Sequence, residues 1–139
     1  MAFLLPLAAL AQAPVQLDPF AQATSALKHC PPAGPRLFTA EEMRTEAHAR
    51  AERGTRCALE GTCEPGGAYK RDGEINERVR AAIAADKRLA ETSIYVTTSR
   101  KWVTLKGCVR TRAQRQAAVE VVHKQPQIER VFDELTLLR

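Results

Sequence analysis

The sequence predicts an α+β fold, a two-layer sandwich in which a three-stranded sheet carries two helices on one face. Two observations in residues 70–139 favour this fold. Apolar residues recur at helical spacing in two segments, and they alternate with other residues in three more. The predicted order is helix, strand, strand, helix, strand. An amino-terminal arm with one extra helix precedes it.

The first predicted helix of this region follows Asp72, Gly73 and Glu74. At 100° per residue, apolar and charged side chains separate onto opposite faces of that helix. The apolar face holds Ile75, Val79, Ala82, Ile83 and Leu89. We expect this face to pack against the sheet.

A predicted β-hairpin comes next. The alternating positions of its two strands are Ile94, Val96, Val103, Leu105, Gly107 and Val109. The apolar side chains among them are predicted to face the helices. Arg100 and Lys101 stand at the turn. A two-residue hairpin turn needs positive φ angles, which Arg and Lys disfavour. We therefore expect a wider hairpin loop.

The second helix and the last strand complete the pattern. Thr111 and Gln114 mark the start of a helix. Its buried face is predicted to hold Ala117, Ala118, Val121 and Val122. The last strand is indicated by Ile128, Val131, Leu135 and Leu137. Strand alternation sends one set of side chains toward the helices and the other set to the opposite face of the sheet.

Residues 70–139 resemble a BON domain, the bacterial osmotic-stress and nodulation module. The resemblance rests on the apolar spacing described above and on Gly107. Arg100 and Lys101 depart from the Asp-Gly or Asn-Gly turn that the family uses, and Gln127 replaces a glycine before the last strand. The resemblance implies a non-enzymatic module that binds phospholipid membranes or envelope partners and supports osmotic-stress or envelope integrity.

Residues 1–13 have the features of a cleaved secretory signal peptide. An apolar run ends at Ala11-Gln12-Ala13, the spelling of a cleavage site, and Pro14 follows. The run is too short to cross a bilayer, which needs about 20 apolar residues, so we predict no transmembrane segment. Export would deliver the protein to the periplasm. The alternative is a frayed apolar terminus in a cytosolic protein.

The predicted arm covers residues 14–69 and begins with a linker rich in Pro, Ala and Gln. Thr39 opens a capping box and Gly54 stands where a C-terminal cap belongs. Together they predict a surface helix over about residues 40–53. A short cysteine loop, residues 57–63, follows the helix.

The cysteines that follow the predicted cleavage point are Cys30, Cys57, Cys63 and Cys108. An even count in a small exported protein favours disulfide bonds, with three possible pairings. A Cys57–Cys63 bond would close the loop locally. The alternative is a zinc site with His29 and His48, but Cys57 and Cys63 are spaced more widely than the ligands of a zinc knuckle. We predict no metal and no cofactor.

Positive charge is concentrated in residues 70–139, which hold fifteen Lys or Arg against nine Asp or Glu. Residues 1–69 hold six against seven. A basic domain suggests nucleic acid as a partner, but predicted export and the lack of a recognition motif argue against it. The sequence also carries no catalytic motif, so we predict that the protein is not an enzyme.

The outer faces of the two helices are the predicted membrane contact. The first helix offers Arg80, Lys87 and Arg88, and the second offers Arg112, Arg115 and Val119. Each cation near an anionic phospholipid surface is worth on the order of 1 kcal/mol, so a few of them give weak, salt-sensitive binding. The alternative is an ordinary solvated face with one exposed valine.

The sheet face turned away from the helices collects Tyr95, Trp102 and Phe132. A cluster of aromatic side chains is unusual on a solvent-exposed face. One hypothesis is that the arm covers this face, held by a disulfide to Cys108 from Cys30 or from the cysteine loop. The alternative is that an envelope protein covers it, which would make the chain a protein–protein adaptor.

Overall fold

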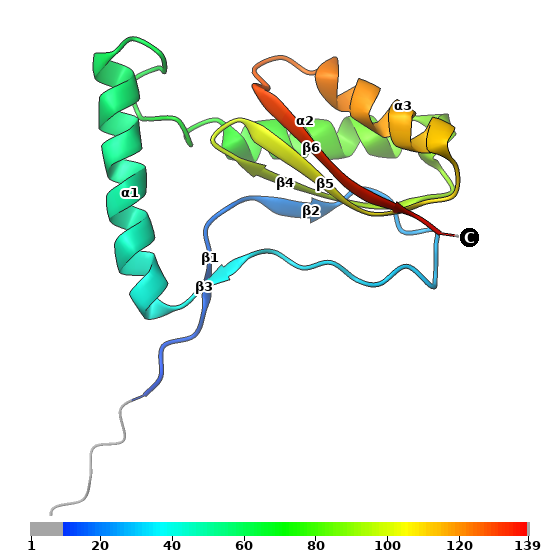
Figure 1. Cartoon of the computed structure of the whole chain (residues 1–139), viewed down its shortest axis with the longest axis horizontal. Helices are drawn as coiled ribbons and strands as arrows, with labels where there is room; N and C mark the ends of the chain where they lie inside the picture. Colours follow the sequence, from blue (N-terminus) through cyan, green and yellow to red (C-terminus); the bar gives the residue numbers. More distant parts are fainter. Residues whose placement is uncertain (1–9, 139) are drawn as a thin grey trace, which may run out of the picture.

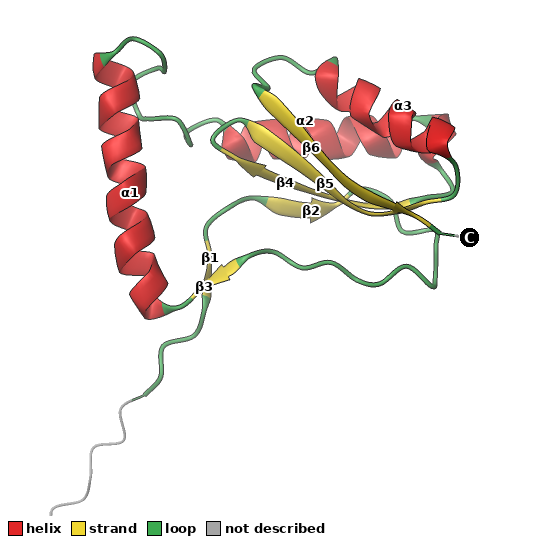
Figure 2. Ribbon diagram, viewed as in Figure 1, coloured by secondary structure: helices red, strands yellow, loops and turns green. Residues whose placement is uncertain are grey.

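The computed structural model describes residues 10–138. Residues 1–9, which include most of the predicted signal peptide, and residue 139 lie outside the described residues. Figures 1 and 2 show the arrangement of the elements. In chain order they are β1 (Val15–Gln16), β2 (Phe20–Gln22), β3 (Leu37–Phe38), α1 (Ala40–Leu59), α2 (Asp72–Ala85), the 3-10 turn η1 (Lys87–Leu89), β4 (Ser93–Ser99), β5 (Trp102–Val109), α3 (Arg112–His123) and β6 (Arg130–Leu137).

The main sheet has four strands in the order β2-β4-β5-β6, so the prediction of three strands is wrong by one. β4 and β5 form the predicted antiparallel hairpin, and β6 joins β5 in parallel. The extra strand β2 comes from the arm and pairs antiparallel with β4, with Phe20 opposite Thr97. β1 and β3 form a separate two-stranded ladder. The arm is therefore built into the sheet instead of serving as a linker.

Helices α2 and α3 lie on the same face of the sheet, as predicted (Figure 1). Between the layers lies one apolar core, made of Ile75, Val79, Ile83, Leu89, Ile94, Val96, Val103, Leu105, Val109, Ala117, Ala118, Val121, Val122 and Leu135. Burying one large aliphatic side chain is worth about 1.5–3 kcal/mol, so this core is the main source of stability in the domain.

The hairpin turn between β4 and β5 is tighter than predicted. Ser99 pairs directly with Trp102, which leaves Arg100 and Lys101 as a two-residue turn with φ angles of 47° and 65°. The expectation of a wider loop is wrong because Asp72 supports the strained turn. Its carboxylate accepts hydrogen bonds from the backbone N–H groups of Arg100 (2.7 Å) and Lys101 (2.8 Å).

Gly107 is required by a close approach between β5 and β4. Its φ is 112°, and a Cβ atom added there would lie 2.0 Å from the carbonyl oxygen of Ser93. Only glycine adopts this backbone conformation without strain and leaves room for the neighbouring strand.

Helix α1 is longer than predicted. The capping box at Thr39 begins it as expected, but the helix continues through Gly54 to Leu59. A glycine inside a helix costs about 1 kcal/mol relative to alanine and does not by itself end the helix. The predicted end near residue 53 is therefore wrong.

The end of α1 is set by Gly61, which has a φ of 71°. The N–H of Gly61 donates to the carbonyl of Ala58 (3.2 Å), and the N–H of Thr62 donates to that of Cys57 (2.9 Å). These two bonds form a Schellman motif. None of the residues of α1 is buried, so the prediction of a surface helix is confirmed. No helix among residues 10–138 is long and apolar enough to span a membrane.

Candidate functional site

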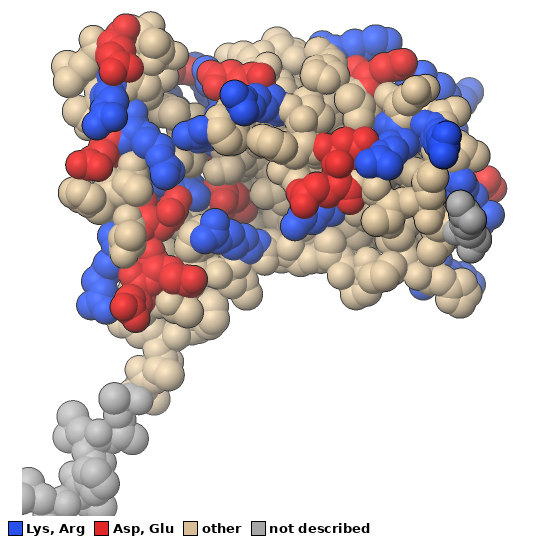
Figure 3. Space-filling model, in the orientation of Figure 1, with Lys and Arg blue, Asp and Glu red and all other residues tan. Residues whose placement is uncertain are grey.

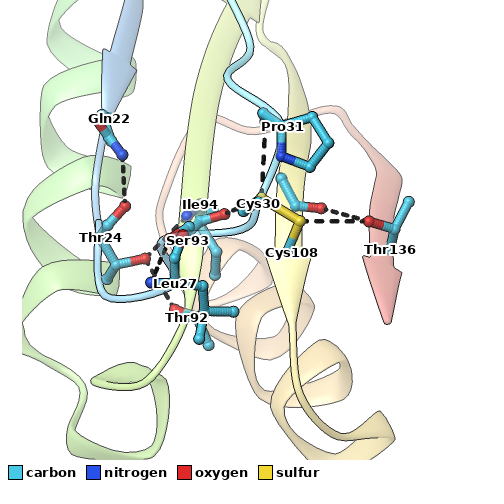
Figure 4. The surroundings of a disulfide bond; sticks show 11 residues. Gln22, Thr24, Leu27, Cys30, Pro31, Thr92, Ser93, Ile94, Cys108 and Thr136 are labelled. Carbon is cyan, nitrogen blue, oxygen red and sulfur yellow. Dashed lines mark hydrogen bonds between the residues drawn. A yellow bond between two sulfur atoms is a disulfide. The ribbon is translucent and has the colours of Figure 1, made fainter. Parts of the chain in front are cut away.

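The arm crosses the outer face of the sheet, the face turned away from α2 and α3, and a disulfide holds it there (Figure 4). Cys30 is bonded to Cys108 of β5, with their Cα atoms 5.8 Å apart. Cys108 is buried beneath the arm. The hypothesis of a disulfide between the arm and Cys108 is confirmed, with Cys30 as the arm cysteine.

Hydrogen bonds reinforce this attachment next to the start of β4. The backbone N–H of Leu27 donates to the Ser93 hydroxyl (2.9 Å), and the Thr24 and Thr92 hydroxyls lie 2.8 Å apart. Thr24 Oγ1 also accepts a hydrogen bond from the N–H of Ile94 (2.9 Å). The chain between β2 and Cys30 is thereby fixed along β4 (Figure 4).

A second disulfide, Cys57–Cys63, closes the carboxyl end of α1. It joins the last turn of the helix to the chain just beyond the Schellman motif. The two disulfides leave no cysteine of the described chain free. The alternative of a zinc site is wrong, since its thiolate ligands are consumed. Disulfides persist in oxidising compartments, and the two bonds fit an exported protein.

The predicted aromatic set is divided between two environments. At one end, Phe20 of β2 stacks on Tyr95, with ring centroids 5.7 Å apart and planes 19° apart. At the other end, Trp102 packs against Phe132 at 5.7 Å, and Phe132 is 39% exposed. The arm thus covers Tyr95 but leaves the Trp102 end of the face less protected.

Arg50 joins α1 to Asp18 in the amino-terminal part of the arm. Its guanidinium donates to Asp18 Oδ1 (2.8 Å) and Glu46 Oε1 (2.9 Å) and lies 4.3 Å from the centroid of the Tyr69 ring. Burial lowers the pKa of Arg50, but the hydrogen bonds to Asp18 and Glu46 outweigh burial and leave the pKa above its ordinary value. Arg53 adds a hydrogen bond to the Tyr69 hydroxyl (2.6 Å).

Asp72 connects this polar cluster to the hairpin turn. Burial raises the pKa of the Asp72 carboxyl, and the hydrogen bonds from Lys101 and Arg100 oppose that rise. The negative charge of nearby Asp18 raises the pKa further. The Asp72 carboxylate stabilises the turn, because its hydrogen bonds come from the backbone N–H groups of the two turn residues.

A cleft lies between α1 and the Trp102 end of the outer face. It consists of two adjoining hollows of about 300 and 380 Å³ that share Arg53, Arg100 and Trp102 as lining residues. The first hollow reaches the Cys57–Cys63 turn, and the second reaches Phe132. Figure 3 shows Lys and Arg side chains, interspersed with Asp and Glu, around the region between α1 and the domain.

The cleft is electropositive because several of its cations lack a carboxylate partner. Among the described residues, no carboxylate lies within ion-pair distance of the lining residues Arg36, Arg56, Arg100 and Lys101. Asp18 and Glu46 also line the cleft, but Arg50 pairs with both. Glu60 and Glu129 line the first hollow, where four cations outnumber them.

Two guanidinium groups lie over the Trp102 ring. Arg100 is 3.5 Å from the ring centroid and Arg130 is 5.0 Å from it. Stacking on an aromatic ring orients a guanidinium while leaving its N–H edge able to donate. The arrangement can therefore bind an anion next to an apolar surface.

The residues predicted for membrane contact lie on the helix side of the domain, and most of their charge is neutralised. Three of them form ion pairs: Arg80 with Glu77 (2.8 Å), Arg88 with Asp86 (2.8 Å) and Arg115 with Asp133 (2.7 Å). Lys87 and Arg112 are exposed and have no carboxylate partner among the described residues. Val119 is half-buried and packs against the core, so it is not the exposed valine of the alternative interpretation.

Reasoning from the sequence missed the cations of the cleft. Arg53 and Arg56 lie on a helix without an apolar face, so its pattern could not indicate which side meets the domain. In the sequence, Arg100 and Lys101 stand out only as turn residues. The spacing of Arg50, Arg53 and Arg56, which puts them near one side of a helix, was the available signal.

The comparison with known proteins concerns the carboxy-terminal half of the chain. The family model for the BON domain matches residues 71–139. This is a family of non-catalytic binding modules known from membrane and phospholipid binding and from osmotic-stress proteins. No curated protein matches the chain.

Proposed function

Because residues 71–139 of the chain are a BON domain, we propose that the protein is a non-enzymatic binding module of the bacterial envelope. Its proposed ligand is the surface of a membrane that contains anionic phospholipid. The family match carries this proposal, since phospholipid binding is a known property of the family.

The charge of the domain supports an anionic ligand. Residues 70–139 hold fifteen Lys or Arg against nine Asp or Glu, whereas the preceding part of the chain is almost neutral. Cations near an anionic membrane contribute on the order of 1 kcal/mol each, and salt screens them. Binding should therefore be weak, reversible and sensitive to ionic strength.

The two disulfides support a location outside the cytoplasm. Together with the apolar run in residues 1–13, they favour export to the periplasm, where the protein would act on a membrane surface. Support of envelope or osmotic-stress integrity is the role that the family suggests.

Liposome flotation tests the proposed function. The oxidised protein is mixed with vesicles of phosphatidylcholine, with or without phosphatidylglycerol, at two salt concentrations. The proposal expects flotation only with phosphatidylglycerol and less flotation at high salt. Failure to float with phosphatidylglycerol at low salt would exclude the membrane as the ligand.

A protein–protein adaptor is the second candidate function. It is favoured by Phe132 and Leu137, which are 39% and 37% exposed on the edge strand β6. Edge strands offer unpaired backbone groups to a partner. A defined envelope partner that binds wild-type protein but not Phe132→Ser, while both proteins fail to float, would favour the adaptor.

A further inference from the structure

We propose that the cleft between α1 and the sheet binds the phosphate ester of an anionic phospholipid headgroup. This inference rests on the proposed function and names the part of the molecule that performs it. The site differs from the helix faces that the sequence indicated, because it lies on the opposite face of the sheet.

The size and position of the cleft suit a headgroup. Each of its two hollows, of about 300 and 380 Å³, is large enough for a small polar ligand. Trp102 lines both hollows, and the Arg100 guanidinium lies against its ring. Tryptophan is enriched at membrane interfaces because it combines an apolar body with one polar group.

The charges of the cleft suit a phosphate ester. Arg100 and Lys101 approach from the hairpin, and Arg53 and Arg56 approach from α1. Arg100, Lys101 and Arg56 have no carboxylate partner among the described residues, so their donors are free for a ligand. Guanidinium groups bind phosphate through paired N–H donors, and such bonds are stronger than bonds between neutral groups.

The hairpin cations are held in place before any ligand arrives. Asp72 accepts hydrogen bonds from the N–H groups of both turn residues, and the Arg100 guanidinium stacks 3.5 Å from the Trp102 centroid. A group that is already ordered loses less conformational entropy on binding. Arg100 is therefore the residue expected to contribute most.

An exposed leucine next to the cleft favours a lipid over an acidic peptide or a free phosphate compound. Leu59 is 84% exposed at the end of α1, in a neighbouring hollow that shares Arg56 and Glu60 with the cleft. An apolar side chain beside a group of cations matches the boundary between headgroups and acyl chains. A soluble anion would gain nothing from Leu59.

The test compares two double variants that remove the same charge. Arg100→Asn with Lys101→Gly empties the hairpin side of the cleft and installs the Asn-Gly pair that a two-residue turn prefers. Because the turn becomes less strained, this variant should be at least as stable as the wild type. Lys87→Gln with Arg112→Gln removes two partnerless cations from the helix side.

Flotation with vesicles of phosphatidylcholine and phosphatidylglycerol measures the effect. The cleft variant should bind about tenfold or more weakly, since each cation contributes on the order of 1 kcal/mol. The helix-side variant should lose clearly less. Equal losses in the two variants, or a larger loss in the helix-side variant, would overturn the cleft as the site. They would leave the proposed function intact, whereas a wild-type protein that does not float would overturn the function itself.

The source of the phosphate is tested with soluble glycerol phosphate and with an acidic peptide such as oligoglutamate. The lipid assignment expects both to bind far more weakly than the vesicles. If soluble glycerol phosphate at micromolar concentration bound as well as vesicles, a free phosphate compound would be the ligand. If oligoglutamate bound the wild type better than the vesicles did, the cleft would be a site for an acidic protein.

Discussion

The BON domain and the arm that precedes it are held in place by different kinds of interaction. The domain encloses an apolar core whose members are almost completely buried. Helix α1 of the arm buries none of its residues and is fixed by Arg50, by contacts of Tyr69 and by the chain on either side. The arm itself is tied to the sheet by Cys30–Cys108 and by strand β2.

The residues that stabilise the domain therefore differ from those that line the cleft. The core contains no residue of α1. The cleft, however, takes one wall from each region, Arg100 and Trp102 from the hairpin and Arg53 and Arg56 from α1. Changes in α1 should therefore disturb ligand binding more than they disturb the fold of the domain.

Removal of the long-range disulfide should have the largest effect. Cys30→Ser with Cys108→Ser opens a loop with a sequence separation of 78. The loss of that loop constraint is expected to cost about 4.5 kcal/mol in chain entropy. Cys57→Ser with Cys63→Ser opens a separation of 6, worth about 2 kcal/mol. Urea unfolding of both variants measures the difference. Equal losses would contradict the different roles assigned to the two bonds.

Limited proteolysis of the Cys30→Ser, Cys108→Ser variant sharpens the same comparison. The arm should become sensitive to protease, while a fragment close to residues 71–139 should resist because its core is intact. Uniform digestion of the whole chain would mean that the domain depends on the arm for its stability.

Gly107→Ala should cost about 3 kcal/mol, because the new Cβ would meet the Ser93 carbonyl and the φ of 112° disfavours alanine. The effect belongs to the domain, since Gly107 lies on the inner strand β5, opposite Ile94 near the open end of the hairpin. Gly73→Ala is the matched control: it lies in α2, has open space around it and should be neutral or slightly stabilising. Thermal unfolding of both variants checks the prediction, and similar melting temperatures would contradict it.

Asp72→Asn should cost about 2 kcal/mol, because the loss of an acceptor leaves a partly buried N–H donor of the turn unsatisfied. The asparagine keeps one oxygen for the turn, but its NH₂ group faces the second backbone N–H. A smaller loss is expected in the background of Arg100→Asn with Lys101→Gly, whose turn needs less support. A double-mutant cycle by urea unfolding measures the coupling, and a coupling energy of zero would contradict the link between Asp72 and the turn.

The smallest effect is a pH dependence at the same residue. The pKa of Asp72 is raised in the folded protein, mainly by burial. The folded chain therefore holds this proton more tightly than the unfolded chain does. The resulting stability is present below the ordinary carboxyl pKa of about 4 and is lost as pH rises through the folded pKa. The unfolding free energy of the wild type, relative to Asp72→Asn, should fall as pH rises above about 4. A flat difference would contradict the raised pKa.

The sequence predicted the domain well because its elements follow simple periodicity. The helical and alternating positions in residues 70–139 became the two layers and the core. The parity of β5 also indicated that Cys108 faces away from the helices. These features depend on local pattern, and local pattern is what a single sequence displays.

The arm was harder to predict because it depends on contacts between distant residues. Strand β2 has only three residues, too few for alternation to stand out. Arg100 and Lys101 adopt positive φ because Asp72, 28 and 29 residues away in sequence, holds their N–H groups. The cleft combines residues from α1 and the hairpin, so no stretch of sequence contains it.

The intrinsic fluorescence of Trp102 tests the central claim most directly, because Trp102 is the only tryptophan of the chain and lies in the cleft. Vesicles containing phosphatidylglycerol should change its emission in a saturable way, and the change should follow flotation across salt concentrations. Binding through the helix faces, on the other side of the sheet, would leave the emission unchanged. Vesicles that bind the protein without any change in Trp102 emission would contradict the account.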